Sequence, residues 1–525
     1  MTTALPRLRL ALLALAAAVL FLPGLASLPV TDRDEARFVQ ASRQMVQDGN
    51  PVDIRFQDVA RLNKPVGIYW LQAAAALASG RRDRAPLWVW RLPSVIGAVA
   101  VVVLVAVIGA PLVGAGPAMM GAALMAVSLV LTAEARIAKT DAVLLALTLA
   151  MMLPVARLHL GQAGARLAWG FWLAFAAAVL VKGPMGPLIV GLTLAALSAL
   201  RRDLGWLRPL ARPLPMLAAA ALVLPWLVAV TWRSGGAFWA ASVGHDLLAK
   251  VASGVEGKGL PPGSYLLAMG FSFWPGAVLV PMALAGVWRR RGQPGVAFLL
   301  AWLIPGWLMF EAVPTKLIHY PMPLYPALSL LAASAWLGGL PVARGARLAA
   351  MLLVPVGPLI LAALIWWGWP QVVAPGIGAL AMAVALSALA WVAIWRDRRD
   401  RAAALLVALG AVVMTGLVIT AARLPVLWPS TQAYVAGQAA TGCPAPHLIG
   451  AGYNEPSLVW LGGRKTRLIA DDAPVPLPLP PCSAVIRPAG LPPLPGLIAT
   501  ARISGFALGA GRAVTLDILT PEVPK

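Results

Sequence analysis

The stretch PSVIGAVAVVVLVAVIGAPL, residues 93–112, decides the fold class. It carries no charged side chain, and a bilayer core about 30 Å thick needs about 20 mostly apolar residues per helix. The stretch therefore predicts a membrane-spanning helix. The whole chain of 525 residues is 60% hydrophobic and 12% charged, whereas soluble proteins carry about 25% charged residues. This composition excludes a soluble, disordered, collagen-like or disulfide-dense chain and predicts a polytopic membrane protein.

Apolar runs of the same kind recur along residues 1–423, and we count about thirteen of them. The segment at 66–80 is about 15 residues long, so it predicts a helix at the membrane interface rather than a span. The first run has a basic start and small residues near its end, as a signal peptide does, but its long apolar stretch favours a retained span. The runs fall near residues 8–29, 93–112, 117–133, 141–156, 167–181, 184–200, 213–231, 262–287, 296–310, 322–339, 348–368, 376–395 and 402–423.

The positive charges indicate which side of the membrane each connection faces. The net charge is +22, and the arginines cluster on alternate connections, which is the pattern of cytoplasmic loops and not of a nucleic-acid-binding surface. This pattern places the N-terminus in the cytoplasm. An odd number of spans then places the connection at 30–92 and the tail at 424–525 on the outer side. The clusters include Arg7 and Arg9, Arg157 and Arg166, Arg201 and Arg202, Arg289 to Arg291, Arg344 and Arg347, and Arg396 to Arg401.

The tail at 424–525 contains short β-rich pieces and helix candidates separated by Pro-rich segments. This pattern predicts a small α/β domain. The chain's two cysteines, Cys443 and Cys482, both lie in it. An oxidising outer compartment predicts one disulfide that closes a loop of about 40 residues, with two unpaired thiols as the alternative. Strands are expected at 447–452, 466–470, 483–487 and 513–519, and helices at 430–440 and 454–461.

The connection at 30–92 concentrates acidic residues just beyond the first apolar run. Residues 31–34 read T-x-x-D, so we expect Thr31 to cap a helix that lies on the membrane surface. Arg37 follows Asp34 by one turn, and the Asp34 carboxylate is expected to face a cavity at the headgroup level. The alternative is that Asp34 and Glu35 only complement the helix dipole.

Further charged motifs follow on the same side of the membrane. Arg61 and Lys64 lie in the first outer connection, where the positive-inside rule does not explain them, and they suit a phosphate-bearing ligand. Three more outer connections read EARIAKTD at 134–141, VKGPMGP at 181–187 and PTKLIHYP at 314–321. Each alone is explained as an interfacial anchor with a snorkelling lysine. Together on one face they predict a site.

These motifs, in this order, resemble the ArnT-like family of bacterial polyprenyl-phosphate-dependent glycosyltransferases. That family includes aminoarabinose transferases acting on lipid A, and eukaryotic protein O-mannosyltransferases are more distant relatives. The resemblance implies an all-α polytopic membrane domain of GT-C type over 1–423, with a catalytic outer loop at 30–92, and a small periplasmic α/β domain over 424–525. The motifs that carry it are DEAR at 34–37, NKPVGIYW at 63–70, AKTD at 138–141, VKGPMGP at 181–187 and TKLIHYPMPLYP at 315–326.

The resemblance also implies roles for individual residues. Asp34 and Asp141 correspond to catalytic acids, and Arg37, Lys64 and Tyr320 correspond to groups that bind the donor phosphate. In the family, lipid A aminoarabinose transferases usually have Glu where this chain has Asn63, so the sugar and a divalent metal at that position stay open. The further site candidates are Glu35, Arg61, Asn63, Lys182, His245 and Lys316.

On this resemblance we expect an inverting glycosyltransferase of the bacterial inner membrane. Its donor is expected to be a sugar on polyprenyl phosphate, and its acceptor a periplasmic envelope molecule, with lipid A or another glycolipid favoured. A transporter or flippase for lipid-linked or anionic solutes, and a protein O-glycosyltransferase, remain as alternatives. Ionisable residues lie mostly at predicted helix ends, whereas transport sites tend to lie near the bilayer midplane, which weighs against transport.

Overall fold

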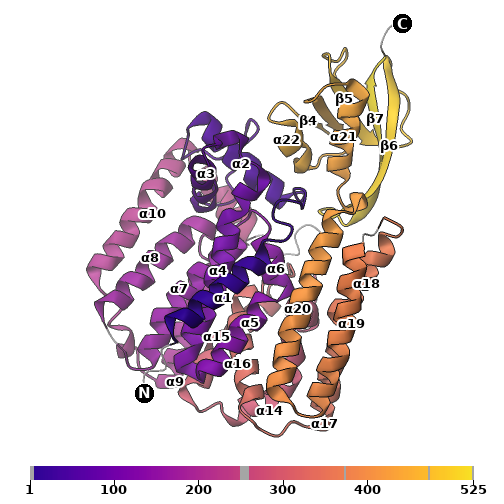
Figure 1. Ribbon diagram of the computed structural model, residues 1–525. Helices are drawn as coiled ribbons and strands as arrows, with labels where there is room; N and C mark the ends of the chain where they lie inside the picture. The colour runs from indigo at the N-terminus through magenta and orange to yellow at the C-terminus, as the bar shows by residue number, and fades with distance from the viewer. Residues whose placement is uncertain (1–4, 163, 249–258, 372–373, 471–472, 523–525) are drawn as a thin grey trace.

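The structure, a computed structural model, is a bundle of helices with a small sheet domain at one end (Figure 1). It describes residues 5–162, 164–248, 259–371, 374–470 and 473–522. The bundle helices are α1 (Arg7–Phe21), α2 (Asp34–Asp48), α3 (Gly67–Ala78), α4 (Leu87–Val113), α5 (Ala115–Ala126), α6 (Leu129–Ala135), α7 (Asp141–His159), α8 (Ala165–Lys182), α9 (Met185–Arg201), α10 (Pro213–Arg233), α11 (Ala237–Trp239), α13 (Ser264–Ser272), α14 (Val280–Arg289), α15 (Pro294–Ala312), α16 (Tyr325–Leu337), α17 (Arg344–Leu353), α18 (Val356–Trp367), α19 (Ala374–Trp395) and α20 (Arg399–Ala422). Shorter pieces are β1 (Arg55–Phe56), β2 (Val59–Ala60), η1 (Arg82–Arg84), η2 (Gly205–Leu207), η3 (Ala240–Leu248), η5 (Gly276–Leu279), η6 (Met322–Leu324) and η7 (Pro425–Leu427).

Every predicted apolar run contains a helix, because a chain in a bilayer has to satisfy its backbone hydrogen bonds internally. Among the described residues, eight helices are long and apolar enough to cross a membrane, or up to ten if each bent pair is one span. The helices α1, α9 and α16 have 15, 17 and 13 residues and are shorter than the roughly 20 residues that a span of the bilayer core needs. The polytopic helical fold is confirmed, and the count of about thirteen spans stays a prediction.

Two glycines let helices approach closely at the end of the bundle that carries the sheet domain, called the domain end below. A Cβ on Gly67, the first residue of α3, would lie 2.8 Å from the backbone carbonyl of Leu180 in α8. A Cβ on Gly97 of α4 would lie 2.9 Å from the backbone nitrogen of Val143 in α7. Only glycine permits such approaches. They bring the segment before α3, the end of α8 and the start of α7 together.

The predicted small α/β domain is confirmed. Its elements are α21 (Pro429–Thr441), β3 (His447–Ala451), α22 (Pro456–Gly462), β4 (Arg467–Ile469), β5 (Ser483–Pro488), β6 (Leu497–Ala507) and β7 (Arg512–Pro521). They include a five-stranded sheet in the order β4-β3-β5-β7-β6, in which β3 is parallel to β4 and β5, and β7 is antiparallel to β5 and β6. The sequence did not predict β6, because this edge strand is largely exposed and lacks a clear apolar alternation.

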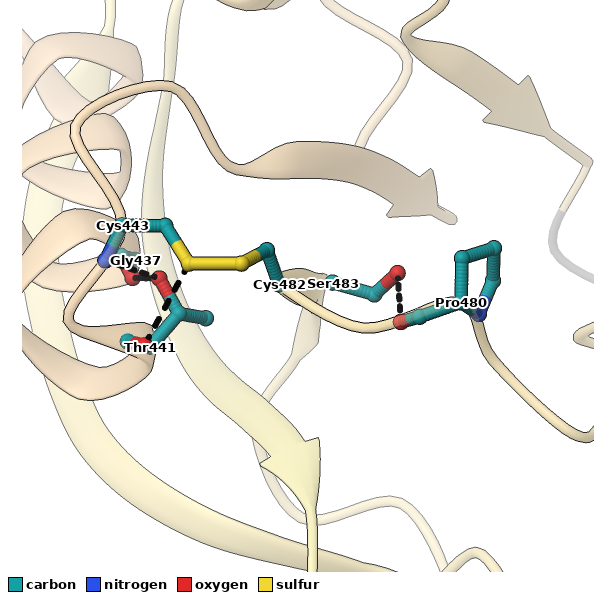
Figure 2. Close-up of a disulfide and its surroundings, with 6 residues drawn as sticks. All are labelled: Gly437, Thr441, Cys443, Pro480, Cys482 and Ser483. Atoms are coloured by element: carbon teal, nitrogen blue, oxygen red, sulfur yellow. Dashed lines mark hydrogen bonds between the residues drawn. A yellow bond between two sulfur atoms is a disulfide. The ribbon is translucent and has the colours of Figure 1, made fainter.

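A disulfide joins α21 to β5 in this domain (Figure 2). Cys443 and Cys482 lie just after the helix and just before the strand, with Cα atoms 5.9 Å apart. On the helix side, the Thr441 hydroxyl donates a hydrogen bond to the carbonyl of Gly437 at 2.7 Å. The pairing expected for an oxidising compartment is therefore present, and the described chain holds no free cysteine.

The structure corrects the prediction for α2 in two respects. The backbone N–H and hydroxyl of Thr31 donate to Oε2 of Glu35, at 2.8 and 3.1 Å, so the predicted cap involving Asp34 is wrong. The helix is also covered on one side by α22 of the C-terminal domain. There Arg43 donates to the carbonyl of Trp460 at 3.0 Å, and its guanidinium lies 3.5 Å from the centre of the Trp460 ring. The helix α2 therefore packs between the bundle and the sheet domain.

Candidate active site

A cluster of ionisable side chains surrounds Asp141, the first residue of α7. Nζ of Lys182, the last residue of α8, lies 2.6 Å from Oδ1 of Asp141, and Nζ of Lys139 lies 3.6 Å from Oδ2. Lys139 also pairs with Oε1 of Glu134 at 2.9 Å, and Nε2 of His319 lies 3.7 Å from Oδ1 of Asp141. All five side chains are largely buried, where charges persist only when they are paired. Three motifs far apart in the sequence therefore meet at one point.

A cavity of about 390 Å³ opens beside this cluster. Lys64, Lys182 and Tyr320 line its polar end together with Asn63, Asp141 and His319. Most of the remaining lining is apolar and comes from α9, α15 and their flanking segments. It includes Met185, Leu188, Ile189, Leu192, Met309, Phe310 and Val313. The cavity therefore joins a cationic end to an apolar slot.

Burial and neighbouring charges set the protonation pattern of the cluster. Burial, together with the charge of Lys139, lowers the pKa of His319 to about 3, so its imidazole is neutral near pH 7. Burial alone would lower the pKa of Lys139, but the carboxylates of Glu134 and Asp141 raise it. Lys139 therefore keeps its positive charge. His319 can form hydrogen bonds, but its neutral imidazole adds no charge to the cluster.

Asp34 lies near this cluster but not in the described lining of the cavity. It is the exposed first residue of α2. Its negative charge acts on both Lys139 and His319, so the carboxylate lies within electrostatic range of the cavity. An exposed carboxylate at this place can meet a molecule arriving from outside the bundle.

Arg37 and Arg61 form a second basic group close to Asp34. The charge of Arg37 interacts with those of Arg61 and Asp34. Nε of Arg61 donates to the hydroxyl of Tyr69 at 2.9 Å, and its guanidinium lies 5.0 Å from the ring centre of Phe38. Neither arginine is among the described residues that line the cavity. The assignment of Arg37 to the donor phosphate, and of Arg61 as a further site candidate, stays a prediction.

Glu35 forms a buried clamp with Arg91 of α4. Both side chains are 0% exposed, and Nε and Nη2 of Arg91 lie 2.7 and 3.0 Å from the two carboxylate oxygens. Oε1 of Glu35 also accepts the backbone N–H of Ala138 at 2.9 Å, and Nη1 of Arg91 donates to the carbonyls of Leu25 and Leu28 at 2.8 Å each. The pair ties the start of α2, the segment after α1 and the loop before α7 together, which is a structural role.

Two further candidates lie apart from the cavity or outside the described side chains. Lys316 is buried, and its Nζ donates to the carbonyls of Phe310, Glu311 and Val313 at 3.1, 2.8 and 2.6 Å, so it closes the turn after α15. His245 lies in η3, and its side chain falls outside the described residues. Among the residues that the structure describes, no group of three or more His, Cys, Asp or Glu side chains could hold a metal ion.

Comparison with solved structures decides the fold. ArnT from Cupriavidus metallidurans in the apo state matches with a TM-score of 0.75 over 97% of both chains, at 17% sequence identity. The chain has the ArnT fold. The same protein bound to undecaprenyl phosphate matches equally, with a TM-score of 0.75 over 97% of both chains at 18% identity. The ArnT-like resemblance read from the motifs is confirmed.

Sequence comparisons agree with this fold. A family model described as dolichyl-phosphate-mannose-protein mannosyltransferase matches residues 63–232. An undecaprenyl phosphate-alpha-4-amino-4-deoxy-L-arabinose arabinosyl transferase from Pseudomonas paraeruginosa is 30% identical over 57% of this chain and 54% of its own length. A transferase of the same name from Pectobacterium carotovorum is 26% identical over 69% of this chain and 66% of its own length. This chain therefore spans between about half and two thirds of the length of these relatives. Its apolar helices and its fold are those of a multi-pass membrane protein.

The sequence reasoning missed Arg91 and gave no role to Lys139 and Glu134. Glu134 and Lys139 lie in the motif at 134–141, which the sequence analysis expected on the same face as the other charged motifs but in which it gave an individual role to Asp141 alone. Arg91 had a readable signal, since it is a lone charge in VWRLPSV at the start of the most apolar run. A charge in that setting needs a buried partner, but the sequence does not say that the partner is Glu35.

Proposed function

We propose that this chain is a membrane glycosyltransferase that moves a sugar from a polyprenyl phosphate carrier to an acceptor in the bacterial envelope. The observation that carries the proposal is the cavity, with Lys64, Lys182 and Tyr320 at one end and an apolar slot along the rest. A phosphate attached to a long hydrocarbon chain has the same two-part chemistry. The relatives are named undecaprenyl phosphate-alpha-4-amino-4-deoxy-L-arabinose arabinosyl transferases, and ArnT from Cupriavidus metallidurans has been solved bound to undecaprenyl phosphate. Both support this donor class.

The apolar slot suits the carrier's hydrocarbon chain. Met185, Leu188 and Leu192 recur at positions i, i+3 and i+7 of α9 and so lie on one face of that helix. Leu188 lines the cavity and is 41% exposed. We propose that a lipid-linked donor enters sideways from the bilayer at this position.

The reaction we propose displaces the carrier phosphate from the anomeric carbon of the sugar. An acceptor oxygen bonds to the anomeric carbon on the face opposite the phosphate. The bond between that carbon and the bridging oxygen of the phosphate breaks at the same time, so the configuration at the carbon inverts. Asp34 accepts the proton of the acceptor hydroxyl as general base. The carrier leaves as a phosphate monoester, and Lys64 and Lys182 stabilise its added negative charge, by about 3 kcal/mol in comparable sites. Asp141 holds Lys182 and Lys139 in place.

We assign the site to the periplasmic side. The cavity is lined by the segment just before α3, the start of α7 and the end of α8. The helix α3 lies at the domain end, whereas the described start of α1 lies at the other end of the bundle (Figure 1). The basic clusters place the N-terminus in the cytoplasm by the positive-inside rule. The acceptor favoured by the motif resemblance is lipid A or another glycolipid of the envelope.

A transfer assay with purified protein tests the reaction. Full-length protein in lipid nanodiscs is incubated with a radiolabelled polyprenyl-phosphate sugar and extracted envelope glycolipids, and labelled product is counted. Asp34→Asn should abolish product formation, while Asp58→Asn, an exposed acid of the same outer loop, should not. Movement of labelled donor across the bilayer without a new bond would instead identify a transporter.

A binding assay tests the donor site separately from the chemistry. Lys64→Ala should weaken binding of unlabelled polyprenyl phosphate at least about tenfold, because a charge-assisted phosphate contact is lost. Lys465→Ala, an exposed lysine of the C-terminal domain, is the matched control. Equal affinity for wild type and Lys64→Ala would remove Lys64 from the donor site.

A further inference from the structure

The connection between α3 and α4 carries three exposed arginines that the proposed catalysis does not use. Arg81, Arg82 and Arg84 lie in and next to η1 and are all exposed. Asp83, the acid among them, accepts a hydrogen bond from Gln47 of α2 at 3.2 Å. In the described part of the chain, no ion pair joins the three arginines to a carboxylate. They form a positively charged surface, called the η1 patch below.

Neighbouring residues place the η1 patch at the level of lipid headgroups. Trp88, in the first turn of the 27-residue apolar helix α4, is 40% exposed. On α3, Leu71, Ala74 and Leu77 are exposed at positions i, i+3 and i+6, which makes an apolar stripe along one side of this short helix. An exposed tryptophan and an apolar stripe beside arginines are what an interfacial helix presents to a bilayer.

The η1 patch is separate from the described lining of the cavity, which includes none of its three arginines. Its contact on α2, Gln47, follows Asp34 by thirteen residues, which corresponds to about 20 Å along a helix. The element η1 contacts α2 and α3, which lie at the domain end (Figure 1). The positive-inside rule explains arginines on the cytoplasmic side only. On the periplasmic side proposed above, these arginines need a different partner.

We propose that Arg81, Arg82 and Arg84 contact the phosphate groups of anionic phospholipids in the outer leaflet of the inner membrane, while the stripe on α3 rests in the acyl region. Guanidinium groups bind phosphate oxygens in pairs, and basic residues next to a bilayer are attracted to anionic headgroups. The contact would fix the depth of α3, which begins three residues after Lys64. The proposal rests on the proposed sidedness but not on sugar transfer.

Lipid enrichment around a fluorescent label tests this contact. Both native cysteines are disulfide-bonded, so a cysteine introduced by Ala78→Cys, at an exposed position on α3, can be labelled alone. Energy transfer from this label to acyl-labelled phosphatidylglycerol and to acyl-labelled phosphatidylcholine is compared in nanodiscs that contain both lipids. We expect phosphatidylglycerol to be enriched at least about fivefold, and the triple variant R81Q, R82Q and R84Q to abolish the enrichment.

A second triple variant serves as the matched control. R464Q, K465Q and R467Q remove three basic residues from the C-terminal domain and should leave the enrichment unchanged, provided that the disulfide stays intact. Enrichment that persists in the η1 triple variant, or that is absent from wild type, would overturn the proposal. Glycerol phosphate added in solution should not displace the lipid, because the contact depends on presentation in the bilayer; displacement by this free phosphate would likewise overturn it. These readouts need no donor sugar, so a failure of the proposed enzyme activity is detected separately.

Discussion

Replacing Glu35 with leucine should loosen the loop that carries Lys139. Glu35 and Arg91 are both 0% exposed, and the substitution leaves the Arg91 guanidinium buried without its carboxylate. Removing one partner of a buried pair costs about 3–5 kcal/mol. The change also leaves the backbone N–H groups of Thr31 and Ala138 without their acceptor. Glu35→Gln keeps one acceptor oxygen and the shape of the side chain, so its cost should be smaller, about 1–3 kcal/mol.

Hydrogen exchange measured by mass spectrometry provides the assay. In Glu35→Leu, amides in 136–141 should exchange faster, whereas amides of β7 in the C-terminal domain should be unchanged and serve as an internal control. Transfer should fall by about a hundredfold, because a shift of about 1 Å in catalytic groups has that effect. Arg91 keeps the pKa of the buried Glu35 below its usual value of 4.5, so the stabilisation is complete above that pH and is lost as the pH falls through the folded-state pKa.

Two results would refute this reasoning. Unchanged exchange at 136–141 in Glu35→Leu would show that the clamp does not hold the loop. A Glu35→Gln variant as damaging as Glu35→Leu would show that the retained shape and acceptor oxygen contribute nothing, contrary to the smaller cost expected for Glu35→Gln.

Three further predictions follow from the packing and the charges. Gly67→Ala should cost about 1–3 kcal/mol and weaken donor binding, because a Cβ there meets the backbone of α8, while Gly170→Ala, which has open space around it, should do neither in the same thermal-shift and binding assays. Burial raises the pKa of Asp32 despite the hydrogen bond from Ser457. Docking of the C-terminal domain should therefore weaken as the pH rises above about 3.8 through the folded-state pKa. Asp32→Asn should remove this dependence of docking on pH, measured by proteolysis. Cys443→Ser should destabilise the C-terminal domain by about 4 kcal/mol in the chain-entropy account, since the bridge spans 39 residues; an unchanged denaturant midpoint of that domain would contradict this.

The fold was readable from the sequence because apolar length and charge are local signals. The run at 93–112 and its repeats predict helices without reference to any contact, and the cysteines with the alternating pieces after 424 predict the small domain. The edge strand β6 was missed because exposure removes the alternation that marks a strand. The short helices α1, α9 and α16 show the same limit, since hydropathy reports apolar runs and not where helical hydrogen bonding ends.

The site was readable only in part. The motifs predicted that Asp141, Lys182 and the segment around His319 gather on one face, and the structure brings both Lys182 and His319 within 4 Å of Asp141. Only the motif resemblance gave Asp34 the catalytic role and left Glu35 as a further candidate. The residue pattern alone did not predict the structural role of Glu35, because its buried partner Arg91 is distant in the sequence. The structure also gives Lys316 a structural role, because its ammonium donates hydrogen bonds to three backbone carbonyls of its own turn.

The function proposed here depends on the cavity beside Asp141 holding the phosphate of a polyprenyl carrier. A structure of the protein determined with bound polyprenyl phosphate is the decisive experiment. We expect a phosphate oxygen at about 3 Å from Nζ of Lys64, with the hydrocarbon chain lying along Met185, Leu188 and Leu192 of α9. A carrier bound elsewhere on the bundle, with this cavity empty, would contradict it.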